Sequence, residues 1–401
     1  MELPLGGMTG MRRIAACLAL LAGALFTPAL AAEECTAPCF GYDLSTKMNL
    51  DWIIGSHPSD FRSTDFYPSF EGEFWFSPAE HLKLVSHLTT EPVLDKVPGE
   101  NRYFGDVGTY AEELYALIEF DPLTVRIGKI DAGFSLASDV LSGINSTNLV
   151  GNFDTDQSWG GEAAVTFDAM GLPQRLTLDA FTTDRTFLSQ SLFTNRGRLR
   201  LSEGEAGNTT GLSSFSAILD GCVGADANEC YDQGRFGYRL AARYQRAGHR
   251  TQDQIDEDLK AYGETALLAA ITSGTGDEDH GLRLLAEGGF LRHFEGGSDD
   301  AFVGTLSAGY ITGPMLYQAA YTLQHDMVSG GPDVNEHLAN LSAAYNLSDG
   351  VELPGGEWIV TGEYTFTRDA DGQNDHLLSL ELEIKLDGTL GGSTKGKSEP
   401  D

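Results

Sequence analysis

The chain has 401 residues and a formal net charge of −33, because 59 acidic residues outnumber 26 lysines and arginines. So few cations argue against a nucleic-acid partner, since phosphates need lysine and arginine side chains to neutralise them. Hydrophobic residues make up only 41% of the chain, which excludes a helical membrane protein. It does not exclude a membrane β-barrel, whose strands are only half apolar.

The first 31 residues have the features of a secretory leader. Residues 11–13 (Met-Arg-Arg) are positively charged, residues 14–25 form an apolar core, and residues 29–31 (Ala-Leu-Ala) make a small-x-small cleavage site. We therefore expect cleavage near Ala31 and release of the mature chain across the inner membrane.

The rest of the chain alternates apolar with polar residues in segments of about ten. Residues 377–386 (Leu-Leu-Ser-Leu-Glu-Leu-Glu-Ile-Lys-Leu) show this alternation most clearly, and a strand places alternate side chains on opposite faces. A soluble β-sandwich or β-helix would alternate too, but strands of ~9–11 residues are typical of a bilayer-crossing barrel. Sixteen segments fit strands: 47–55, 66–76, 81–90, 110–120, 122–130, 158–168, 173–183, 211–220, 235–246, 261–272, 281–293, 300–311, 314–324, 336–346, 356–367 and 375–386.

The connections between these segments alternate between short and long. If the first strand runs outward, the short connections fall on the periplasmic side and most long ones on the outer side, as in outer-membrane barrels. The sequence therefore predicts an all-β fold, a transmembrane antiparallel up-and-down β-barrel of about 16 strands. We place a periplasmic segment at 32–46, the barrel at 47–386 and a flexible polar tail at 387–401. The long connections are 91–109, 131–157, 184–210 and 247–260, and 221–234 is long for a turn.

Four cysteines follow the leader in two local pairs, Cys35 with Cys39 and Cys222 with Cys230. In an oxidising periplasm each pair is expected to close a small disulfide loop. The alternative is free or partly paired thiols.

The barrel pattern over 47–386 resembles the Gram-negative outer-membrane porins of the general diffusion type. Residues 122–131 (Pro-Leu-Thr-Val-Arg-Ile-Gly-Lys-Ile-Asp) are similar to the porin strand that carries a glycine and a basic residue into the third outer loop. The resemblance implies that the loop from Asp131 to Gln157 folds inward and narrows a water-filled channel. It also implies passive diffusion of small hydrophilic solutes and ions, and a homotrimer in the outer membrane. The last strand departs from the porin pattern, because Leu386 stands where porins commonly have a final aromatic residue.

A sixteen-stranded barrel leaves an open lumen, and the charges that line its narrowest part set its selectivity. We expect a constriction in which loop carboxylates face wall arginines. The alternative is that these acids are ordinary solvated loop charges. The sequence does not decide between cation and anion selectivity. The expected pore-lining residues are Asp131, Asp139, Asp154 and Asp156 in the loop, and Arg126, Arg239, Arg243, Glu381 and Glu383 on the wall.

Catalytic signatures are missing from the sequence, which has neither a Gly-x-Ser-x-Gly nor a His-Glu-x-x-His motif. We therefore expect no enzymatic activity, no cofactor and no metal site. The expected partners are outer-membrane lipid and the permeating solutes, without nucleic acid. Two alternatives stay open, a barrel hydrolase and a secreted, non-membrane β-protein that binds ligands.

Overall fold

The computed structural model describes residues 36–57, 61–169, 171–223, 226–256, 260–277, 279–351, 353 and 356–390. Within these ranges, no helix is long and apolar enough to cross a membrane. The predicted leader and its cleavage site near Ala31 lie outside the described residues.

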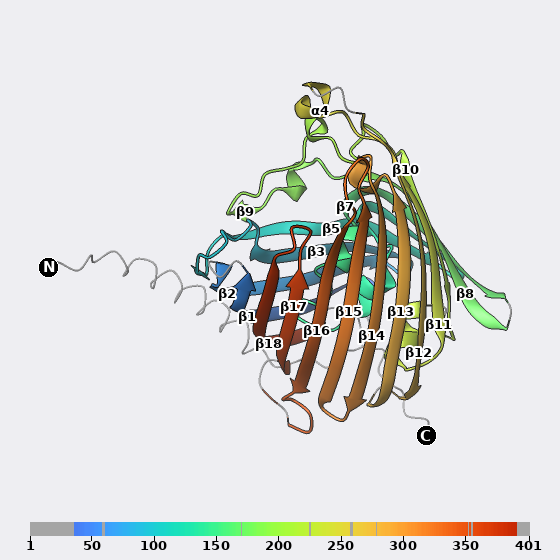
Figure 1. Ribbon diagram of the computed structural model, residues 1–401. Coiled ribbons are helices and arrows are strands. Elements are labelled where there is room, and N and C mark those ends of the chain that lie inside the picture. The colour runs from blue at the N-terminus through green and yellow to red at the C-terminus, as the bar shows by residue number, and fades with distance from the viewer. Residues whose placement is uncertain are drawn as a thin grey trace, which may run out of the picture.

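Sixteen long strands form one closed antiparallel barrel (Figure 1). β1 pairs with both β2 and β18, and this pairing of the first and last strands closes the sheet. Two further strands, β4 (Arg102–Tyr103) and β9 (Leu192–Phe193), belong to connections. The long strands are β1 (Cys39–His57), β2 (Thr64–Ala79), β3 (Leu82–Pro92), β5 (Val107–Phe120), β6 (Leu123–Ala132), β7 (Thr155–Ala169), β8 (Leu172–Thr183), β10 (Ser214–Gly221), β11 (Gly237–Gln245), β12 (Glu264–Gly276), β13 (His280–Arg292), β14 (Asp300–Thr312), β15 (Met315–Met327), β16 (Val334–Asn346), β17 (Glu357–Arg368) and β18 (Asn374–Leu390).

Each of the sixteen predicted segments corresponds to one of these strands, so the predicted barrel is confirmed. Two predicted boundaries are wrong. β1 begins at Cys39, within the segment assigned to the periplasm, and β18 continues to Leu390, into the predicted tail. The two extensions pair with each other, with Phe40 opposite Leu390. Each extension thus satisfies its backbone hydrogen bonds through the opposite end of the chain.

The two faces of the wall have opposite chemistry. Large apolar side chains point outward and are exposed, among them Leu267 (57%), Leu306 (61%) and Leu341 (60%). Charged side chains such as Arg239 and Glu287 are buried in the interior. A soluble β-sandwich would bury the apolar face instead, so this arrangement excludes that alternative and fits a wall that faces lipid.

Exposed aromatic side chains form a band near each end of the outer wall. Such girdles occur in transmembrane barrels at the height of the lipid headgroups. One band includes Trp52, Phe215, Tyr244, Phe290 and Phe302, and the other includes Phe76, Phe120, Phe167, Tyr310, Tyr317 and Tyr345.

The connections sort by length between the two ends of the barrel, as the sequence predicts. We call the end with the long connections the loop end, and α4 and β9 mark it in Figure 1. The opposite end, the turn end, holds the first and last residues of the barrel. Loop-end connections include 93–106, 133–154, 184–213 and 246–263. The helices are α2 (Leu136–Val140), α3 (Ala227–Asp232) and α4 (Gln252–Asp256), and the 3-10 segments are η2 (Val150–Phe153), η3 (Phe187–Ser189), η4 (Leu201–Glu203) and η5 (Phe294–Gly296).

One of the two predicted disulfides lies wholly within the described residues, and the structure confirms it. Cys222 and Cys230 are bonded and lie in the connection between β10 and β11 at the turn end. The predicted pair of Cys35 and Cys39 falls partly outside the described residues, because Cys35 is not among them; Cys39 is buried at the start of β1.

Candidate functional site

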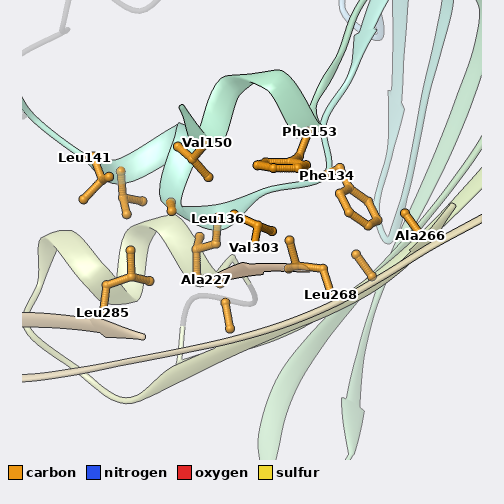
Figure 2. Close-up of a cluster of buried hydrophobic side chains, with 14 of the residues drawn as sticks. Phe134, Leu136, Leu141, Val150, Phe153, Ala227, Ala266, Leu268, Leu285 and Val303 are labelled. Atoms are coloured by element: carbon orange, nitrogen blue, oxygen red, sulfur yellow. The ribbon is translucent and has the colours of Figure 1, made fainter. Parts of the chain in front are cut away.

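The connection at residues 133–154, which we call the third loop, turns into the barrel after β6 and packs against the inner wall (Figure 2). Its apolar side chains are fully shielded, with Phe134 at 1% exposure and Leu136 and Phe153 at 0%. Burying a side chain of this size stabilises the packing by about 1.5–3 kcal/mol. The wall contributes Ala266, Leu268, Leu285 and Val303 to this cluster.

A carboxylate of the wall holds the start of the helix in the third loop. Glu287 of β13 accepts hydrogen bonds from Ser135 Oγ at 2.7 Å, Leu136 N at 2.7 Å and Ala137 N at 3.1 Å. These backbone amides begin α2, whose Ser135 side chain also caps the helix by accepting from Ser138 N. A carboxylate at this position satisfies amides that have no partner within the helix.

The third loop extends along the lumen to the far wall. Asn145 N donates to Glu363 of β17 at 2.8 Å, and Asn145 Nδ2 donates to Ser379 of β18 at 2.9 Å. Gly143 allows this close approach, because a Cβ there would collide with the Glu363 carboxylate. The third loop therefore extends across the barrel interior from β11 to β18, and it narrows the space between these strands.

The connection at residues 222–236, which we call the disulfide turn, enters the lumen from the turn end. Its helix α3 buries Ala227 in the same apolar cluster as the third loop (Figure 2). Tyr231 of α3 belongs to this cluster as well. Tyr231 accepts a hydrogen bond from Gln318 Nε2 of β15 at 3.2 Å, and Asn228 Nδ2 donates to Asp139 of the third loop at 3.3 Å. The lumen is thus narrowed from both ends.

A polar cavity of about 360 Å³ lies between these two elements and the wall formed by β3 to β11. Eight carboxylate side chains line this acidic cavity together with three arginines and one histidine. They are Glu112, Glu113, Asp131, Asp139, Glu162, Asp179, Asp220 and Asp226, with Arg126, Arg175, Arg239 and His87.

Four of the predicted pore-lining residues meet in the acidic cavity: Asp131, Asp139, Arg126 and Arg239. Arg239 bridges the loop and the wall, with Asp139 at 2.7 Å and Asp220 at 2.9 Å. Loop carboxylate and wall arginine therefore form a direct ion pair and do not face each other across open space. Asp131 lies near the end of β6 and not in the loop itself.

Asp154 and Arg243, which the sequence predicts as pore-lining residues, are not among the residues that line this cavity. Asp154 Oδ1 accepts from Phe134 N at 3.1 Å and Ser135 N at 2.8 Å, and burial raises the pKa of Asp154 to about 6. Arg243 donates to Phe153 O at 2.6 Å and pairs with Glu264 at 2.8 Å. Both side chains hold the third loop in place.

The remaining predicted residues also lie apart from the acidic cavity. Asp156 belongs to β7, and its side chain is outside what the structure describes. Glu381 and Glu383 follow Ser379 on the inner face of β18, beyond the contact of the third loop with that strand. Ser45 Oγ donates to Glu383 at 2.7 Å.

No candidate metal centre occurs in the described part of the chain, where no three histidine, cysteine, aspartate or glutamate side chains are grouped suitably.

Solved structures with the same barrel are outer-membrane porins and channels. OmpF of Salmonella typhi, solved with daunomycin, superposes with a TM-score of 0.56 at 11% identity, covering 86% of this chain and 97% of OmpF. OprB of Pseudomonas putida gives 0.55 at 11% identity, with 87% and 94% covered. The channel DcaP of Acinetobacter baumannii gives 0.52 at 10% identity, with 89% and 100% covered. The fold is that of an outer-membrane porin. No family model and no curated protein matches the sequence.

Within this porin fold, sequence reasoning missed Glu162, Asp179, Asp220 and Glu287. All four occupy the polar phase of an alternating strand, so the period of two could have placed them on the inner face. Nothing local distinguishes Glu287 as the anchor of the third loop, because its partners lie about 150 residues earlier in the chain. The entry of the disulfide turn into the lumen was also missed, and its only signal was the unusual length of that connection.

Proposed function

We propose that the protein is an outer-membrane channel for passive diffusion of small hydrophilic solutes and that it favours cations. The observation that carries the proposal is the lining of the acidic cavity, where eight carboxylates face three arginines. An excess of one charge in a narrow, low-dielectric passage concentrates ions of the opposite sign.

Ion pairing leaves this excess of negative charge in place. Arg126 is shared between Glu162 and Glu113, Arg239 between Asp139 and Asp220, and Arg175 lies 3.6 Å from Asp226. Each arginine of the cavity thus has at least one carboxylate partner, and its positive charge is compensated locally. The surplus carboxylates remain to attract permeating cations.

Planar-bilayer recording tests the channel and its selectivity together. Purified protein is expected to give discrete, long-lived conductance steps, with a reversal potential under a KCl gradient that shows preference for K⁺. Absence of steps from protein shown to be folded would contradict the channel, and a reversal potential of the opposite sign would contradict the cation preference.

Glu113→Gln is expected to move the reversal potential toward that of an unselective pore. Glu113 lines the acidic cavity and accepts from Asp131 N at 3.1 Å, and glutamine retains an oxygen acceptor while removing the charge. Glu119→Gln is the matched control, because Glu119 lies on the same strand, pairs with Lys83 and does not line the cavity. Equal shifts in the two variants would contradict the assignment of selectivity to this cavity.

The cellular location and the assembly belong to the same proposal. The barrel with its aromatic bands supports insertion into the outer membrane after cleavage near Ala31, and the resemblance to porins supports a homotrimer. Light scattering of the detergent-solubilised protein gives the mass of the assembly, and N-terminal sequencing of the membrane fraction gives the cleavage site.

A further inference from the structure

We propose that Glu162 and Asp179 form a subsite of the channel wall for the primary ammonium group of a permeating organic solute. This inference rests on the proposed channel function and names a class of solute that the channel would favour.

The two carboxylates face each other on neighbouring strands. Glu162 of β7 is directly opposite Asp179 of β8 in the strand register, and both line the acidic cavity. Each residue is only 4% exposed. Like charges at directly opposed positions destabilise a pair of strands, so a nearby cation stabilises this pairing.

The protein supplies only part of that compensation. One oxygen of Glu162 pairs with the Arg126 guanidinium, and one oxygen of Asp179 accepts from Ser216 Oγ. Glu162 Oε1 and Asp179 Oδ1 accept no hydrogen bond from any residue that the structure describes. No lysine, arginine or histidine that the structure describes lies within ion-pair distance of Asp179.

A buried carboxylate oxygen without a partner is unfavourable, and a cation with N–H donors relieves this cost. A primary ammonium carries three donors on a compact charge, so it can donate to both oxygens and retain a third donor for water. Calcium prefers six to eight oxygen ligands, whereas two unpartnered oxygens are present here.

Neighbouring side chains fit the rest of such a solute. Thr177 is two residues before Asp179 on β8, so its side chain lies on the same face of the strand and also lines the cavity. Asp220 and Asp131 line the cavity as well. These groups offer further acceptors to an amino sugar or an amino acid. Binding of moderate strength would attract the solute into the narrow region and still allow it to leave.

Two isomeric cations, butylammonium and tetramethylammonium, provide the decisive probes, since they share one charge and four carbons but only butylammonium has N–H donors. Each is titrated against the K⁺ current of the wild-type channel in a planar bilayer. Because hydrogen bonds to charged groups are strong, butylammonium is expected to reach half-inhibition at about tenfold lower concentration. Equal concentrations for the two cations would overturn the subsite.

Asp179→Asn and Glu162→Gln are expected to abolish most of this difference, and Glu119→Gln is expected to keep it. If both subsite variants keep the difference, the ammonium binds elsewhere and the proposal fails. If either variant fails to fold, the comparison of the two cations on the wild-type channel still tests the subsite, because equal half-inhibition concentrations would overturn it. A channel that conducts K⁺ without discriminating the isomers refutes the subsite alone, whereas absence of any conductance refutes the channel as well.

Discussion

Glu287→Ala is expected to release the third loop from the wall and to raise the single-channel conductance. The Glu287 carboxylate accepts one hydroxyl and two backbone hydrogen bonds at the start of α2, inside the barrel. Without the carboxylate, two buried backbone N–H donors lose their partner, and each unpaired donor costs about 1–3 kcal/mol. Such a loss lowers the ratio of docked to released loop by about a hundredfold or more.

Conductance and its fluctuations in a planar bilayer measure this release directly. Because the apolar cluster also holds the loop, Phe153→Ala combined with Glu287→Ala is expected to enlarge the conductance further. Glu119→Ala removes a wall carboxylate without touching the third loop and should leave the conductance near that of the wild type. Unchanged conductance in the combined variant would show that the third loop does not limit the passage.

Reduction of the Cys222–Cys230 disulfide is expected to widen the passage from the turn end. The bond closes the disulfide turn, whose helix α3 lies in the lumen against the third loop. A disulfide of this kind contributes about 2–4 kcal/mol by restricting the released chain. Without it, α3 loses part of the constraint that keeps Tyr231 and Ala227 packed inside the barrel.

A membrane-impermeant reductant added to one side of the bilayer reports both the effect and the orientation. Conductance should rise only when the reductant reaches the turn end. The double variant Cys222→Ser with Cys230→Ser should have a higher conductance than the oxidised wild-type channel. Its conductance should not change when the reductant is added. If thiol labelling confirms reduction while the conductance stays constant, α3 does not narrow the channel.

The sequence was sufficient for the barrel wall because strand signals are local. A period of two appears within each segment, and leucines such as Leu380 and Leu382 alternate with charged residues regardless of the rest of the chain. The start of β1 was missed because residues 39–46 contain Cys39 and Gly41, which weaken that pattern. Gly41 is required there, since a Cβ would collide with the Trp75 indole of the neighbouring strand.

The candidate site was only half predictable. Alternation shows which residues lie on the inner face of the wall, and two residues chosen in this way, Arg126 and Arg239, line the acidic cavity. It does not show how far a loop reaches, so Asp154 and Arg243 were expected in the passage although they fasten the loop to the wall. Contacts such as that of Asn145 with Glu363 join residues 218 positions apart, and no local pattern encodes them.

Because β1 pairs with β18, the barrel can close only when all strands from β1 to β18 are present. Phe40 pairs with Leu390, so the contacts that close the wall join the first strand to the last and form only after β18 has been synthesised. A product that stops before β18 would leave β1 and β17 with free edges, each a template for pairing with other chains. Premature termination would therefore produce aggregating protein instead of a smaller pore.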